Sequence, residues 1–466
     1  MERFTGQDAS FLYMETPNVH MHTLKVAVID LPAQIPYPDV FELVRISMES
    51  KLHLVPRLRL RPVEVPGGLH HPMWVQDPHF NIGRHLFRSK INAPGGQREM
   101  DQAIAQIAST QLPRDRPLWE TWLLEGLAEG GIVLVTKIHH ALADGVASAT
   151  MLSKVMTLEP DPDDLNAPNP SWIPESIPPR RKLFRDALQD QAEQLGTIGP
   201  LVRRTVKGGI NVLRNLKHRA VDVPYPFVTP RTVFNRTLSP ERSFATTSLP
   251  VAELKAVKNA ARVTLNDVVL ATVAGALDRF FEARGHHLDK PLIASVPMAV
   301  VAPDEAPREA GNRVANLFTS LCNDVHDPLE RLQKIHAVTK QAKEVQQQLG
   351  METMLDWSEA APAAAYRWIL GTYSQSGLSD VMPPPANLIV SNVRGPDNPL
   401  YVAGARLRTI YSVGPAVEGI GLNITGWSYC GDIAFALIAD AEAIPDPHFI
   451  TESLRPALDD LMRATL

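Results

Sequence analysis

Two stretches rich in proline restrict what this chain can fold into more than any other feature of its sequence. The first runs over residues 159–179 and contains seven prolines, and the second covers residues 224–230. Because proline has no N–H group and a fixed φ angle, neither stretch can sustain a helix or a central strand. We therefore expect an N-terminal lobe over residues 1–158, a proline-rich linker with a basic crossover segment over residues 159–225, and a C-terminal lobe over residues 226–466.

The size and composition of the chain fit two globular lobes. Its 466 residues are too many for one ordinary core, and 44% hydrophobic and 21% charged residues are typical of a soluble globular protein. The N-terminus has no apolar leader, and no stretch of about 18 apolar residues is free of charge, so we expect no transmembrane helix. The two cysteines, Cys322 and Cys430, are too few for a disulfide framework, which favours a cytoplasmic location.

The net charge restricts the partners of the protein. A net charge of -5 provides no basic field that would attract a phosphate backbone. The sequence also shows no helix-turn-helix, zinc-finger or aromatic RNA-binding signature. We therefore expect no nucleic-acid partner.

Hydrophobic periodicity predicts helices and strands in both lobes, and hence an α/β protein. The expected helices cover residues 97–110, 147–156, 251–261 and 268–281. The expected strands cover residues 118–127, 132–139, 292–297, 387–392, 421–427 and 433–438. The run over residues 132–139 is rich in β-branched residues, which favours a mostly buried strand.

The chemistry is expected where this strand ends, at His139-His140-Ala141-Leu142-Ala143-Asp144-Gly145. A strand end holds side chains rigidly, and a neutral imidazole, with an ordinary pKa of about 6.5, can accept a proton at physiological pH. Asp144 can fold back to hold the loop or pair with a cation. Gly145 lets the backbone turn sharply with no side chain in the way. A base of this kind suits the activation of a hydroxyl group.

Residue types alone leave other interpretations of the motif open. One histidine could be a core residue beside a solvated one. A metal site would need further ligands, and neither a cysteine cluster nor a His-Glu-x-x-His motif accompanies the pair, so we expect no metal. A serine hydrolase would need a Gly-x-Ser-x-Gly nucleophile elbow, which the sequence lacks. Direct transfer is therefore favoured over covalent catalysis.

The pattern His-His-x-x-x-Asp-Gly resembles that of the acyl-CoA-dependent acyltransferase superfamily, which includes chloramphenicol acetyltransferases and peptide-synthetase condensation domains. Within it, the chain resembles the bacterial wax ester synthase/diacylglycerol acyltransferase family, with matches nearly from end to end. The other blocks that carry the resemblance are Phe11–Pro17 with Met21-His22, Arg116-Pro117-Leu118-Trp119-Glu120, Thr264–Leu270 and Ser391–Pro396. In the last block Arg394 stands where proline is usual.

This resemblance implies two chloramphenicol-acetyltransferase-like lobes with a mixed sheet each. An active-site tunnel would run between them, entered by acyl-CoA from one face and by the alcohol from the other. The resemblance also implies that His140 is the general base, that His139 supports the loop, and that Asp144 is structural, bonded to an arginine away from the substrate. Acyl-CoA is then a substrate, and neither a cofactor nor an acyl-enzyme is expected.

The other blocks admit both structural and functional interpretations. Thr264 followed three residues later by Asp267 is typical of a helix N-terminus, which favours a structural role for Asp267. Asn266 could face the tunnel and donate a hydrogen bond to the oxyanion. For the block Pro117, Leu118 and Trp119, core packing is favoured over substrate contact.

A basic helix is predicted over residues 199–219, although Gly208-Gly209 weakens it. Six cations occur there without an acidic residue, and apolar residues recur at helical spacing on another face. Such a helix could lie on an anionic lipid surface, the inner membrane or a lipid droplet, or it could pack across the two lobes with its charges in water. The six cations are Arg203, Arg204, Lys207, Arg214, Lys217 and Arg219.

The leading hypothesis for function is O-acyl transfer from a long-chain acyl-CoA to diacylglycerol or to a long-chain alcohol, which yields triacylglycerol or wax ester. A first alternative keeps this chemistry but uses a secondary-metabolite alcohol as acceptor. A second alternative is a non-catalytic lipid-binding or lipid-droplet protein. An intact His140 argues against the second, because a protein without catalysis has no need of that base.

Overall fold

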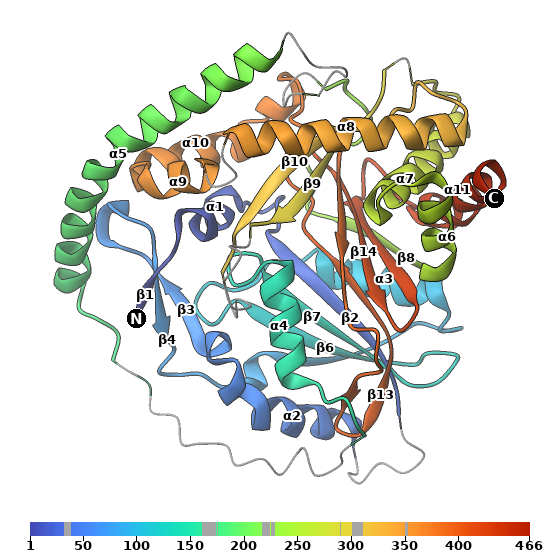
Figure 1. Ribbon diagram of the computed structural model, residues 1–466. Helices are drawn as coiled ribbons and strands as arrows, with labels where there is room; N and C mark the ends of the chain where they lie inside the picture. Colours follow the sequence, from blue (N-terminus) through green and yellow to red (C-terminus); the bar gives the residue numbers. More distant parts are fainter. Residues whose placement is uncertain are drawn as a thin grey trace.

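The computed structural model contains two six-stranded sheets that contact each other and carry helices on their outer faces (Figure 1). It describes residues 1–31, 39–160, 174, 176–216, 224, 229–288, 290–300, 311–349 and 353–466. Most of the predicted proline-rich linker and the last residues of the predicted basic helix lie outside the described residues.

The first sheet is mixed, as the resemblance implied, because all neighbouring strands are antiparallel except β5 and β6. Its strands, in spatial order, are β12 (Tyr401–Val402), β13 (Ala405–Val413), β2 (His22–Asp30), β7 (Ile132–His139), β6 (Trp119–Glu125) and β5 (Leu86–Lys90). Two of these strands, β12 and β13, come from the C-terminal part of the chain. The predicted lobe boundaries stay a prediction, and the first sheet does not follow them strictly.

The second sheet is also mixed, because β11 runs parallel to both of its neighbours while the other pairs are antiparallel. Its strands, in spatial order, are β10 (Val314–Ser320), β9 (Ile293–Ala299), β11 (Leu388–Val393), β14 (Leu422–Tyr429), β15 (Asp432–Asp440) and β8 (Arg242–Pro250). A small third sheet is formed by β1 (Glu2–Arg3), β4 (Met73–Gln76) and β3 (Leu60–Val63).

Helices lie between the two large sheets and on the outer face of each. α3 (Gln97–Ala108) lies between them, and its apolar face packs on β2, β7, β8 and β15. α2 (Val40–Lys51) and α4 (Gly145–Val155) pack on the outer face of the first sheet. The outer face of the second sheet is covered by α6 (Val251–Ala261), α7 (Leu265–Glu282), α8 (Pro328–Leu349) and α11 (His448–Thr465). The remaining helices are α1 (Gly6–Met14), α5 (Arg180–Leu216), α9 (Thr353–Ala360) and α10 (Ala363–Gln375).

Hydrophobic periodicity predicted the central elements correctly. The strand expected over residues 132–139 is β7, and the helix expected over residues 251–261 is α6, with the predicted bounds in both cases. α4 and α7 begin a few residues earlier than predicted, because Asp144 and Thr264 cap them. The other expected strands correspond to β6, β9, β11, β14 and β15, and the remaining expected helix to α3.

The predicted basic helix is the second half of α5, which is 37 residues long and continues through Gly208-Gly209. Figure 1 shows α5 in green along the outer edge of the molecule. Its first half packs Leu183 and Ala187 against the third sheet. Its second half contacts α8 and α9, where Trp357 Nε1 donates to Thr205 Oγ1 at 2.9 Å.

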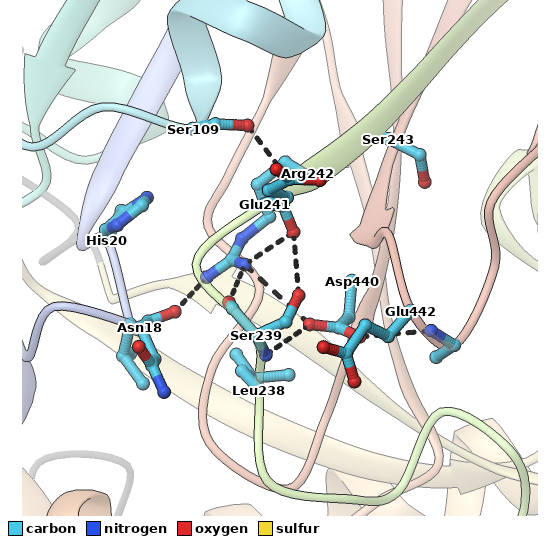
Figure 2. A network of polar contacts seen from close by, with 12 residues as sticks. Asn18, His20, Ser109, Leu238, Ser239, Glu241, Arg242, Ser243, Asp440 and Glu442 are labelled. Atoms are coloured by element: carbon cyan, nitrogen blue, oxygen red, sulfur yellow. Dashed lines mark hydrogen bonds and ion pairs between the residues drawn. The ribbon is translucent and has the colours of Figure 1, made fainter.

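A buried polar network surrounds the start of β8 (Figure 2). The Arg242 guanidinium donates to the carbonyl oxygens of Ser239 at 2.6 Å and Glu241 at 3.0 Å, and it lies 3.9 Å from the Asp440 carboxylate. It also donates to the carbonyl of Asn18, which belongs to the N-terminal part of the chain. The network therefore joins β8 and β15 to the loop that precedes the first large sheet.

Among the residues that the structure describes, no single helix has both the length and the hydropathy of a membrane span. α6 and α7 meet those criteria only as a pair, and the chain bends by 106° between them.

Candidate active site

The backbone at the end of β7 positions both imidazoles of the predicted motif. His139 is the last residue of β7 and lies opposite His22 of β2. The next residue, His140, is still held by the neighbouring chain, because its N–H donates to the carbonyl of Met21 at 2.7 Å. Both side chains therefore project from the rigid, hydrogen-bonded end of an interior strand.

The His140 imidazole contacts two residues that are distant in the sequence. Its Nδ1 lies 2.9 Å from Oδ1 of Asn312, and the Phe11 ring stacks on it with centroids 4.2 Å apart. His140 is partly exposed, but the surrounding protein desolvates its ring and lowers its pKa to about 4, while the Asp144 charge and the Asn312 hydrogen bond oppose the shift. The ring is therefore neutral at physiological pH and able to accept a proton.

His139 is buried on the other side of the loop. Its Nδ1 accepts a hydrogen bond from the Ala141 N–H at 3.1 Å, and its Nε2 lies 3.7 Å from the Glu15 carboxylate. Burial by itself would raise the pKa of Glu15, but its interactions with His139 and Arg114 outweigh burial and hold that pKa at about 2. These contacts hold the loop, although the supporting role in catalysis stays a prediction.

Asp144 is buried and joins two segments through main-chain donors. One carboxylate oxygen accepts from the Ala147 N–H at 2.9 Å and caps α4, while the other accepts from the Arg313 N–H at 3.1 Å. Its charge also acts on the buried Lys25. Burial lowers the pKa of Lys25 to about 8, and the Asp144 charge opposes part of this shift. One of its main-chain donors thus belongs to an arginine, Arg313, and the structural role of Asp144 stays a prediction.

The sharp turn expected at Gly145 does not occur there. Gly145 is the first residue of α4 and lacks a positive φ angle. A Cβ at this position would meet Val393 Cγ2 at 3.5 Å, which is an ordinary contact. The turn is unnecessary because Asp144, with extended backbone angles, already starts the helix. The nearby glycine that does need a positive φ angle, of 77°, is Gly311.

Residues 311–313 complete the site and were not predicted from the sequence. The Gly311 N–H donates to the Leu142 carbonyl at 2.9 Å, and the Gly311 carbonyl accepts from the Asp144 N–H at 3.2 Å. The next two residues contact His140 and Asp144, so this short segment touches the whole motif loop. A Gly-Asn pair before a strand is typical of a turn, but no local signal connects it with a histidine 172 positions earlier.

Asp267 lies in the first turn of α7 and caps it. Its carboxylate accepts from the Thr264 N–H at 2.9 Å, and its own N–H donates to Thr264 Oγ1 at 3.2 Å, which forms a capping box. It also lies 2.7 Å from Nδ1 of His336 on α8. Its neighbour Asn266 makes no side-chain hydrogen bond to any described residue, and its role as an oxyanion donor stays a prediction.

The block Pro117, Leu118 and Trp119 is buried beside the motif. The Trp119 ring is buried, stacks on His85 with centroids 4.4 Å apart, and donates from Nε1 to the Leu58 carbonyl at 2.8 Å. The Leu118 carbonyl accepts from the His139 N–H at 3.0 Å. The block therefore supports the strand that carries the imidazoles.

Arg394, where the resembled family usually has proline, lies at the surface just after β11. Its side chain is 86% exposed and approaches Asp397 at 3.4 Å. The chain accommodates this residue because the side chain extends into solvent.

Two hollows lie beside the motif. An apolar cavity of about 140 Å³ lies between the first sheet and helices α2 and α4, and Ile138 of β7 is part of its lining. An open groove of about 490 Å³ lies between α1 and α10, and its lining includes Glu15 and Trp368. The tunnel implied by the resemblance stays a prediction.

Two further histidines near the site, His20 and His22, contact main-chain oxygens. His20 and His22 both contact the carbonyl of Ala108, at 3.3 Å and 3.0 Å. Across the described ranges, no three histidine, cysteine, aspartate or glutamate side chains gather so as to hold a metal ion.

Comparison with known proteins gives matches along the whole chain. Residues 4–269 match the wax ester synthase/diacylglycerol acyltransferase catalytic domain, and residues 310–462 match the WS/DGAT C-terminal domain. Two proteins of Mycobacterium tuberculosis (strain H37Rv), both named as diacylglycerol O-acyltransferases, are 39% and 35% identical to this chain. The alignments cover 100% of it and 96% and 98% of those proteins.

Solved structures show the same fold. The wax ester synthase/diacylglycerol acyltransferase from Marinobacter aquaeolei VT8 has a TM-score of 0.69 and 26% identity, with 100% of both chains covered. The first condensation domain of the calcium-dependent antibiotic synthetase has a TM-score of 0.58 and 14% identity, with 100% of this chain and 96% of that chain covered. The second likeness concerns the fold alone.

Proposed function

The chain belongs to the wax ester synthase/diacylglycerol acyltransferase family of acyltransferases, and we propose that it transfers a long-chain acyl group from acyl-CoA to the hydroxyl group of diacylglycerol or of a long-chain alcohol. The product is triacylglycerol or a wax ester, and coenzyme A is released. No acyl-enzyme forms in this proposal, and acyl-CoA is a substrate and not a bound cofactor.

In the proposed reaction, the alcohol oxygen attacks the thioester carbonyl carbon while His140 removes the hydroxyl proton. The tetrahedral oxyanion then collapses, the C–S bond breaks, and the proton held by His140 passes to the departing thiolate. A thiol with a pKa of about 8.5 is a better leaving group than an alcohol, which makes ester formation favourable.

The observation that carries this proposal is the environment of His140. Its ring is partly exposed, held between Asn312 and Phe11, and kept neutral by a pKa of about 4. A neutral, immobilised imidazole at a strand end is what general base catalysis on a hydroxyl group needs.

The apolar cavity under α4 supports a hydrocarbon substrate. Its volume of about 140 Å³ is close to that of an engineered apolar cavity, about 150 Å³, that binds benzene. It shares Val55 and Met151 with a larger open hollow of about 500 Å³. The cavity alone holds a short apolar segment, and the adjoining hollow offers room for a longer chain.

The acceptor is tested by incubating the purified protein with palmitoyl-CoA and one acceptor at a time, and by following coenzyme A release and the labelled ester. We expect release with a diacylglycerol or a long-chain alcohol and little with a short polar alcohol. Transfer only to polar secondary-metabolite alcohols would overturn the assignment of a lipid acceptor. Binding of lipid without any ester would indicate a non-catalytic lipid-binding protein.

The pH dependence of the reaction follows from the lowered pKa of His140. Only the unprotonated ring accepts a proton, so kcat/KM should be flat through neutral pH and fall about tenfold per pH unit below a pKa of about 4. Initial rates of coenzyme A release across the acid range test this, with aliquots returned to neutral pH to exclude irreversible unfolding. A fall in kcat/KM that begins near the ordinary histidine pKa of about 6.5 would show that burial does not lower the pKa of His140.

We also propose that the protein is cytoplasmic and that α5 brings it to an anionic lipid surface, the inner membrane or a lipid droplet. Val202 and Val206 point outward, with 42% and 55% of their surface exposed, and Arg203 and Lys207 are exposed beside them. Apolar and cationic side chains on one outer stretch of helix suit the boundary between lipid headgroups and acyl chains. The packing of α5 against the third sheet and α9 is compatible with this, because it uses the opposite side of the helix.

A fourfold variant, Val202→Ser, Arg203→Gln, Val206→Ser and Lys207→Gln, tests the lipid contact. We expect it to lose flotation with anionic vesicles, while coenzyme A release with a dispersed alcohol is retained. The matched control is Arg98→Gln with Arg463→Gln, two exposed cations on α3 and α11, which lie across the molecule from α5 in Figure 1. Unchanged flotation of the fourfold variant would rule the lipid contact out.

A further inference from the structure

The amide of Asn312 can adopt only one orientation in its surroundings. One end of the amide lies 2.7 Å from the main-chain carbonyl oxygen of His140 and 2.7 Å from a carboxylate oxygen of Asp8. A main-chain carbonyl can only accept a hydrogen bond, so the group facing it must be the Nδ2 amino group of Asn312. The opposite end, which faces the His140 ring, is therefore the oxygen Oδ1.

This orientation determines the protonation of the His140 ring. Oδ1 of Asn312 lies 2.9 Å from Nδ1 of His140 and can only accept a hydrogen bond. Nδ1 must then carry the proton, and in the neutral ring Nε2 is left with a free lone pair. His139 has the opposite tautomer, because its Nδ1 accepts from the Ala141 N–H. The two adjacent imidazoles thus have different tautomers because their hydrogen-bond partners differ.

Asp8 holds the amide from the other side. It lies on α1, is buried, and accepts from Asn312 Nδ2 with one oxygen. Its second oxygen, which accepts no hydrogen bond from any described residue, lies 4.0 Å from the Arg57 guanidinium. A Cβ on Gly311 would come within 3.4 Å of that oxygen, and the positive φ angle of Gly311 lets the chain pass close to Asp8.

We propose that Asn312 is a positioning residue that fixes His140 in the tautomer with Nδ1 protonated, so that Nε2 is the catalytic base, and that Asp8 fixes the orientation of Asn312. This inference rests on the proposed function for its catalytic consequence, but the tautomer itself does not depend on any substrate. The Phe11 ring, stacked on His140 with an interplanar angle of 19°, restricts rotation of the imidazole out of this arrangement.

The tautomer can be measured without an activity assay. In protein with ¹⁵N-labelled histidine, we expect Nδ1 of His140 to give an N–H resonance and Nε2 to resonate as an unprotonated nitrogen. The signals are assigned by their loss in His140→Gln. In Asn312→Ala the ring should populate the other tautomer. A wild-type ring protonated on Nε2, or a tautomer unchanged in Asn312→Ala, would overturn the proposal.

Kinetics test the catalytic consequence. We expect Asn312→Ala to lower kcat about 10- to 100-fold with little change in KM, as for partners that orient a functional histidine. The acid limb of kcat/KM should also move to lower pH, because the hydrogen bond that His140 donates to Asn312 Oδ1 raises the pKa of His140. The matched control is Asn316→Ala, an exposed asparagine on β10.

A pair of variants at Asp8 separates positioning from packing. Asp8→Asn keeps an oxygen that can accept from Asn312 Nδ2, whereas Asp8→Leu keeps the branched shape and removes the acceptor. Asp8→Asn should retain more of kcat than Asp8→Leu, with wild-type circular dichroism in both. Equal losses would show that Asp8 does not orient Asn312. If the wild-type protein transfers no acyl group, the proposed function fails, while the tautomer measurement still decides the present inference.

Discussion

His140→Ala is expected to lower kcat for coenzyme A release by about 10²- to 10⁴-fold, the usual contribution of a general base. The substitution removes the imidazole that Asn312 and Phe11 hold at the end of β7. KM for acyl-CoA should change little, because the proposed role of the ring is in proton transfer and not in binding. Initial rates of coenzyme A release with diacylglycerol and with a long-chain alcohol measure the effect.

Two further variants make the His140 result interpretable. His140→Gln keeps much of the side-chain volume and a hydrogen-bonding group, so a loss as large as that of His140→Ala would assign the effect to the missing base. His79→Ala, at an exposed histidine of the same lobe, controls for removal of any imidazole. Wild-type activity in both His140 variants would show that another group removes the hydroxyl proton.

Asp440→Ala is expected to have the largest effect on stability, about 3 to 5 kcal/mol, the range for breaking a buried ion pair by removing one partner. Asp440 is fully buried and accepts from the N–H groups of Ser239 at 2.6 Å and Ala443 at 3.0 Å. Its removal also leaves the Arg242 guanidinium without its carboxylate partner (Figure 2). Burial lowers the pKa of Arg242 to about 10, an effect that Asp440 and Glu418 oppose, so the buried guanidinium is charged at neutral pH and would lose the first of these two carboxylates.

The midpoint of urea unfolding, followed by circular dichroism and by tryptophan fluorescence, measures this loss. Coincidence of the two signals is needed before a free energy of unfolding is assigned, because large proteins can unfold in steps. The control is Asp446→Ala, which breaks an exposed ion pair with Arg98 and should have a much smaller effect. A midpoint for Asp440→Ala close to that of the control would mean that water or another group compensates Arg242.

Local patterns predicted the elements that position the site. The β-branched run that forms β7 is mostly buried on both faces. A strand of this kind is recognisable from its apolar residues alone, without knowing which elements pack on it. The Thr264–Asp267 capping box and the Asp144 cap are likewise local, because their donors and acceptors lie within three residues of one another. α1, β2 and β13 were not predicted, although Thr5 caps α1 and β-branched residues occur in both strands.

Long-range contacts account for the features that local sequence patterns did not predict. Gly145 starts α4 without a positive φ angle, whereas Gly311, which precedes β10 and approaches Asp8, has one. β13 joins the first sheet by pairing with β2 across more than 370 positions of sequence, so a linear division into lobes could not foresee it. The basic segment is part of a longer helix because Leu183 and Ala187 pack on the third sheet, far upstream of the cations.

The sequence by itself determined where the buried strand ends and that two imidazoles lie at its end, followed by a capping carboxylate and a helix. It could do so because hydrophobic periodicity and helix capping act over a few residues. Only the tertiary structure decided what surrounds those imidazoles. Phe11, Asn312 and, through Asn312, Asp8 reach His140 from segments separated by 129 to 172 positions. The desolvation that lowers the pKa of His140, and the hydrogen bond that orients its ring, exist only when those segments have packed together.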